Sequence, residues 1–142
     1  MMRPKTLWFV PVLCAALLAS ACNNNNPLLA QPTATGPATQ ITDNFPGTLT
    51  VNGGVTFPFS VQQTGTITAT LTALSPDSSV TVGLLMGTWN GTSCAVSIVN
   101  DAATVNATVT GNATGTGNFC VRVYDVGKLT APTDFNVSIV HY

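Results

Sequence analysis

The sequence predicts an all-β domain over residues 43–142, folded as a two-sheet antiparallel sandwich of about seven to eight strands. The first observation is a period of two. In residues 65–74 (GTITATLTAL), isoleucine, alanine and leucine alternate with threonine. The second is that turn-forming residues separate such runs at regular intervals. The third is that no run in this part of the sequence has a convincing helical period.

The other strand candidates show the same alternation of apolar and polar residues. They are residues 55–61, 80–86, 105–109, 119–123 and 135–139. In each run the apolar residues share one parity, so one face of the strand would lie on a core and the other would face solvent. Short strands of this kind bury enough apolar surface only when two sheets pack together.

Four features indicate how the strands connect. Asn52-Gly53-Gly54 fits a tight hairpin between residues 47–51 and 55–61, because Asn and Gly tolerate the positive φ that such a turn needs. Ser75-Pro76-Asp77 and Asn90-Gly91 predict two further reversals. Pro58 has the outward parity of its run, which predicts an edge strand, where its missing N–H does no harm.

The N-terminus is typical of an export signal. Arg3 and Lys5 precede an apolar run over residues 7–19, which is shorter than the roughly 20 residues of a membrane-spanning helix. Ala19-Ser20-Ala21-Cys22 resembles the lipobox of bacterial lipoproteins, in which the cysteine is acylated and becomes the first residue of the mature chain. We therefore expect a lipoprotein signal peptide over residues 1–21 and lipidation of Cys22. The alternative is an ordinary secretory signal cleaved near a cysteine.

Residues 22–42 are expected to form a flexible linker between this anchor and the domain. After Cys22 the segment is uncharged, rich in Asn, Pro, Thr and Ala, and without periodicity, so it cannot bury enough apolar surface to fold. The predicted location is the cell envelope. Asn rather than Asp at position 23 resembles the sorting pattern for the outer membrane in a double-membraned bacterium.

The charge of the mature chain argues against nucleic acid as a partner. Removal of residues 1–21 would leave Arg122 and Lys128 against five aspartates, a net charge of −3, and the sequence has no glutamate. No basic cluster remains to neutralise phosphates. The predicted partners are instead a membrane, through the lipid, and a polysaccharide or protein ligand.

Cys94 and Cys120 are the two cysteines of the predicted domain. Oxidation is expected in an exported protein, so we predict that they form a disulfide. Two free thiols and a metal-binding pair are the alternatives. Cys120 has the opposite parity to Phe119 and Val121, which places the disulfide on an outer face or at a strand end.

Residues 43–142 resemble the bacterial pre-peptidase C-terminal domain. The resemblance is carried by FPGTLTVNGGVTFPFSV, by GTITATLTALSPDSSVTVGLLMGTWNG, and by NFCVRVYDVGKL with FNVSIVH. It implies a small jelly-roll-like β-sandwich of the kind that accompanies secreted peptidases. Related collagen-binding modules, some of which bind calcium, suggest that the first residues of the domain could meet a neighbouring loop.

The possible calcium ligands are Asp43 and Asn44, at the start of the domain, and Asn100 and Asp101, in a predicted loop. Calcium takes several oxygen ligands from carboxylates, amides and carbonyls. The alternative is that these residues only form turns. No other cofactor is predicted.

The sequence does not predict an enzyme. His141, the only histidine, stands at the end of a predicted strand, and the five aspartates show no spacing typical of acid–base catalysis. Trp89, at a predicted loop tip, and Tyr124, on an outward parity, could stack on a sugar ring or a peptide. Alternatively, Trp89 caps the core and Tyr124 fills a sheet face.

These features together predict a non-catalytic surface binding or adhesion module. The alternatives are a structural component of the envelope and an accessory or inhibitor of a secreted peptidase.

Overall fold

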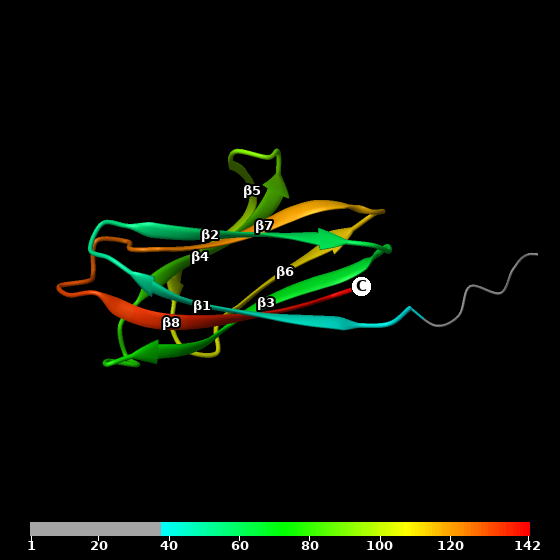
Figure 1. Cartoon of the computed structure of the whole chain (residues 1–142). Helices are drawn as coiled ribbons and strands as arrows, with labels where there is room; N and C mark the ends of the chain where they lie inside the picture. The colour runs from blue at the N-terminus through cyan, green and yellow to red at the C-terminus, as the bar shows by residue number, and fades with distance from the viewer. Residues whose placement is uncertain (1–37) are drawn as a thin grey trace, which may run out of the picture. The chain divides into compact units, whose positions relative to one another are not determined.

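The computed structural model describes residues 38–142, which form two four-stranded antiparallel sheets (Figure 1). The strands are β1 (Ile41–Leu49), β2 (Gly54–Val61), β3 (Gly65–Ser75), β4 (Val82–Trp89), β5 (Cys94–Ala103), β6 (Thr108–Ala113), β7 (Gly117–Tyr124) and β8 (Thr133–His141). Sheet A has the order β1-β8-β3-β6 and sheet B the order β2-β7-β4-β5. This is the strand order of a jelly roll, so the predicted sandwich is confirmed.

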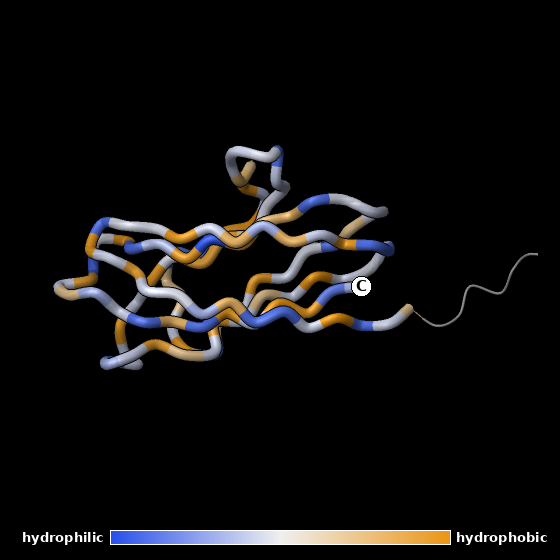
Figure 2. Tube along the Cα trace, in the orientation of Figure 1, coloured by the Kyte–Doolittle hydropathy of each residue, from blue (hydrophilic) through white to orange (hydrophobic). Residues whose placement is uncertain are grey.

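The core lies between the two sheets and follows the predicted alternation. In β3, Ile67, Ala69 and Leu71 are buried against sheet B, while the intervening threonines face outward. The tube in Figure 2 shows the same alternation of apolar and polar positions along several strands. Burial of each large apolar side chain contributes about 1.5–3 kcal/mol to the free energy of folding.

The connection between β1 and β2 is a turn, but it is not the predicted hairpin. The N–H of Gly53 donates to the Thr50 carbonyl oxygen over 2.9 Å, and Asn52 has the positive φ of 56°. However, β1 pairs with β8 and β2 pairs with β7, so the turn crosses from sheet A to sheet B. The physical reason is the core: Phe45 of β1 and Phe57 of β2 stack across the sandwich, with ring centroids 4.9 Å apart.

The other turn predictions are confirmed. Asn90 and Gly91 lie at the tip of a true hairpin between β4 and β5, where Gly91 has a φ of 96°. The Asn90 side-chain oxygen accepts the N–H groups of Thr92 and Ser93 at 2.9 and 2.8 Å, which holds the tip in place. A reversal follows Ser75 between β3 and β4. Pro58 is exposed on β2, an edge strand of sheet B.

Two local predictions are wrong. Asn100 and Asp101 lie inside β5 rather than in a loop, because the register shift opposite Val82–Leu84 accommodates them within the strand. The strand predicted over residues 105–109 begins only at Thr108, after a turn in which Asn106 has a φ of 71°. The first strand, β1, begins at Ile41, and the predicted domain start, Asp43, is its third residue.

The predicted signal peptide, Cys22 and residues 22–37 of the predicted linker lie outside the described residues. Within residues 38–142, no helix is long and apolar enough to cross a membrane.

Candidate functional site

The predicted disulfide between Cys94 and Cys120 is present and lies on the outer face of sheet B, the face turned away from sheet A. Cys120 is fully buried, although its neighbours Phe119 and Val121 face the core. Cys94 is the first residue of β5, and β4 separates this strand from β7. Two strands apart in a flat sheet are about 9–10 Å from each other. The two Cα atoms are 5.8 Å apart, so the β4–β5 hairpin must bend over the sheet.

Gly87 is the position that allows this bend. The register between β4 and β5 shifts after Met86, where two residues of β5 oppose one of β4. Such a bulge bends a strand and increases its twist. A Cβ atom at Gly87 would collide with the carbonyl oxygen of Ala95, so this close approach of the two backbones requires glycine.

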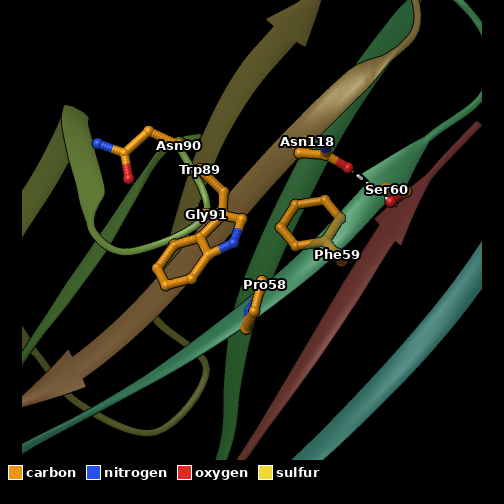
Figure 3. A pocket seen from close by; sticks show the side chains of 7 residues that line it. All are labelled: Pro58, Phe59, Ser60, Trp89, Asn90, Gly91 and Asn118. Atoms are coloured by element: carbon orange, nitrogen blue, oxygen red, sulfur yellow. Dashed lines mark hydrogen bonds between the residues drawn. The ribbon is translucent and has the colours of Figure 1, made fainter.

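The bend places Trp89 beside the outer face of sheet B, where it borders an open pocket of about 500 Å³ (Figure 3). The pocket is lined by Pro58, Phe59 and Ser60 from β2, by Asn118 from β7, and by Trp89, Asn90 and Gly91 from the hairpin. Figure 3 shows the indole ring next to Pro58. Phe59 borders the pocket from β2, but its ring is buried in the core. The volume falls in the range of small-molecule sites in proteins.

The polar groups of the pocket are oriented by hydrogen bonds within the domain. The Ser60 hydroxyl donates to Oδ1 of Asn118 over 2.8 Å. This bond fixes the amide so that its Nδ2 group is the end available to a ligand. The Asn90 side chain, in contrast, is engaged in the hairpin tip. The pocket thus combines one large aromatic surface with one positioned amide.

Tyr124 is on the same face of sheet B but does not belong to this pocket. It pairs with Gly83 and Gly54, six residues along β7 from Asn118, which corresponds to about 20 Å. Its ring lies over Gly83, where a Cβ atom would collide with it. Its hydroxyl donates to the Asp101 carboxylate. The structure therefore does not bring Trp89 and Tyr124 together.

The predicted calcium ligands are also separated. Asp43 and Asn44 lie on β1, at one edge of sheet A, whereas Asn100 and Asp101 lie on β5, at an edge of sheet B. β1 lies against β2 and β5 against β6, so the two pairs are on opposite sides of the sandwich. Over residues 38–142, no group of three His, Cys, Asp or Glu side chains is arranged to hold a metal ion.

Each of the five aspartates has a partner within the domain. Asp43 contacts His141, Asp101 accepts from Tyr124, and Asp134 accepts the Thr48 hydroxyl. The other two hold turns. Asp77 accepts from Ser79, and Asp125 accepts the N–H groups of Asn52, Lys128 and Leu129. These backbone bonds, led by the one from Asn52, keep the pKa of Asp125 below its usual value. The carboxylates thus form hydrogen bonds that hold turns and join strands within the domain.

His141 is buried at the end of β8, with 2% of its surface exposed. Its Nε2 lies 3.1 Å from Oδ2 of Asp43, and its ring centroid lies 5.3 Å from that of Phe59. The pair joins β8 to β1, its neighbour in sheet A. Nδ1 is buried with no hydrogen-bond partner.

Of the residues that line this pocket, only Trp89 was predicted as a ligand contact, and it is the last residue of β4 rather than part of the loop tip. Pro58, Ser60 and Asn118 share the outward parity of their strands, which was a usable signal. The pairing of β2 with β7, which brings Ser60 opposite Asn118, had no local signal.

No protein-family model matches the sequence, and no curated protein is significantly similar to it. By fold and site, the described part of the chain is a disulfide-bonded jelly-roll sandwich with an aromatic pocket on the outer face of one sheet.

The environment of Tyr124 predicts an ionisation at unusually high pH. Desolvation, together with the hydrogen bond to Asp101 and the charge of that carboxylate, raises the pKa of Tyr124 from 10.0 to about 12. The folded state holds the phenol proton of Tyr124 more tightly than the unfolded chain does. The contribution of this group to the stability of the folded state is therefore complete below pH 10 and is lost as the pH rises towards 12. A spectrophotometric phenolate titration of a Tyr142→Phe variant measures this pKa.

Asp101→Asn should lower the pKa of Tyr124 only part of the way, because desolvation remains. A phenolate that forms in the native protein at or below the ordinary pKa would contradict the observed packing.

Proposed function

We propose that the protein is a non-catalytic cell-envelope lipoprotein that displays its β-sandwich as a surface binding or adhesion module for a polysaccharide or an extended protein. We assign the sandwich to the pre-peptidase C-terminal type on the sequence runs quoted above, and the jelly-roll strand order supports this assignment. The lipid on Cys22 would hold the domain at the membrane, and residues 23–40 would act as its tether.

The Trp89 pocket is the observation that carries the binding proposal. A large aromatic side chain that stays half-exposed beside a concave surface is more typical of a ligand site than of a core. A disulfide, a bulge and a glycine with no room for a Cβ atom together hold this side chain in place. Such support is what a preorganised binding surface needs.

The arrangement of the titratable groups supports a role without catalysis. The aspartates hold turns and strand ends, and the histidine is buried against Asp43. A catalytic acid or base has to reach a bound substrate. None of the residues that line the Trp89 pocket is titratable.

The anchor is tested by metabolic labelling. When the full chain is expressed in a bacterium fed an alkyne-tagged fatty acid, we expect label on the protein, which should be recovered in the membrane fraction. Cys22→Ser should abolish both results, because it removes the acylated thiol. Unlabelled wild-type protein in the soluble secreted fraction would contradict the proposal.

The binding surface is tested with the full chain in detergent micelles, assayed against immobilised polysaccharides and matrix proteins. We expect Trp89→Ala to weaken binding by about tenfold or more, since loss of a central aromatic contact costs more than about 1 kcal/mol. Tyr124→Phe is the matched control and should leave binding unchanged, because that ring lies outside the pocket.

Equal loss of binding in both variants would contradict the assignment of the site. If no polysaccharide or matrix protein binds, the structural role in the envelope replaces the binding role.

A further inference from the structure

We infer that the pocket takes a neutral polysaccharide, with the face of one pyranose ring on Trp89 and a hydroxyl group of the sugar hydrogen-bonded to Asn118. The inference rests on the proposed binding function and narrows its ligand to one chemical class. Four features of the pocket support the inference: the aromatic ring of Trp89, the amide of Asn118, the absence of charged lining residues and the proline in β2.

The aromatic wall fits the apolar face of a sugar ring. A pyranose presents several C–H groups on one face, and these pack on the negative face of an aromatic π-system. Trp89 offers the largest such surface among the side chains. Pro58, which is exposed on the same face, lies next to the indole and extends the apolar surface (Figure 3).

The amide of Asn118 supplies the polar contact that a sugar requires. A hydroxyl group both donates and accepts, and a carboxamide carries two donors and one acceptor. The Ser60 hydroxyl holds Oδ1 at 2.8 Å, so the Nδ2 donors are positioned before a ligand arrives. A positioned side chain loses less rotamer entropy on binding. Ser60 is therefore a positioning residue for Asn118.

The pocket has no group to match a charged ligand. Its lining side chains are uncharged, and Arg122 is four residues from Asn118 along β7, which corresponds to about 13 Å. The Arg122 guanidinium lies over Gly54 instead. A carboxylate, sulfate or amine entering the pocket would lose hydration without gaining a partner of opposite charge. The hydroxyl groups of a neutral ligand cost less to dehydrate than a charged group does.

Pro58 disfavours an extended protein segment as the ligand. A peptide at this edge of sheet B would bind by adding a strand to β2. Pro58 stands in the middle of β2 and has no N–H to donate, so the ladder would be interrupted beside the pocket. A polysaccharide needs no such ladder and can follow the open surface.

Trp89 fluorescence gives a direct test. In a Trp8→Phe background, Trp89 is the only tryptophan of the full chain. The probes are hydroxyethylcellulose, mannan and dextran as neutral polymers, alginate as an acidic one, chitosan as a basic one, and gelatin as an extended protein. We expect saturable binding of at least one neutral polymer, with a change in Trp89 emission that added salt does not weaken.

Asn118→Ala should weaken this binding about fivefold to tenfold, and Ser60→Ala about twofold to threefold. Asn112→Ala is the matched control: Asn112 also accepts a hydroxyl hydrogen bond, from Thr66 over 3.2 Å, but it lies on sheet A. It should leave binding unchanged. Thermal unfolding midpoints of the three variants separate loss of binding from loss of folding.

Three results would overturn the inference. The first is that only alginate, chitosan or gelatin binds and changes the emission of Trp89. This result would overturn the inference of a neutral polysaccharide but leave the proposed binding function intact. Undiminished neutral-polymer binding by a folded Asn118→Ala variant would remove the assigned contact. Failure of every probe to bind would remove the proposed function together with the inference.

Discussion

The close approach of Gly87 to the backbone of Ala95, locked by the Cys94–Cys120 disulfide, is the constraint on which the site depends. In a flat sheet B, Trp89 would simply end β4 and point into solvent. The bulge after Met86 bends the hairpin, and the disulfide reaches over β4 to join β5 to β7. Trp89 is thereby held beside Pro58 and Asn118, from strands distant in the sequence. One backbone contact thus links the covalent structure of the domain to its candidate binding surface.

The two outer faces of the sandwich differ in the size of the side chains that cover them. Threonines on β3 and β6 pair across sheet A, as at Thr68 and Thr110, and give a polar face of small side chains. On the outer face of sheet B, large side chains pack directly on glycines: Tyr124 lies over Gly83 and Arg122 over Gly54. β4, which contains Gly83, is buried over most of its length, on both faces.

Most of the strands overlap runs that could be predicted from the sequence, because alternation is a local property. β5 (Cys94–Ala103) was not among the predicted runs, and the pairing of the strands could not be predicted. Asn52 has the positive φ that its turn needs, yet the same turn can close a hairpin or cross between sheets, and the stacking of Phe45 on Phe57 decides between them. Asn100 and Asp101 resembled a loop because Asx residues favour turns, whereas a bulge keeps them in β5. For the pocket, Trp89 was identifiable as a large exposed residue. Asn118 and Ser60 acquire their role only through the β2–β7 register.

The position of Trp89 in a variant without the disulfide tests this dependence most directly. In a Trp8→Phe background, Cys94→Ser with Cys120→Ser should shift Trp89 emission to longer wavelength and increase its quenching by acrylamide, because the hairpin is released from the sheet. The far-UV circular dichroism should keep its β-sheet spectrum, while the free energy of unfolding should fall by about 3–4 kcal/mol for a closed loop of about 26 residues. Unchanged emission and quenching of Trp89 in a folded variant would show that the Cys94–Cys120 disulfide does not position Trp89. That result would contradict the dependence of the candidate binding site on the disulfide.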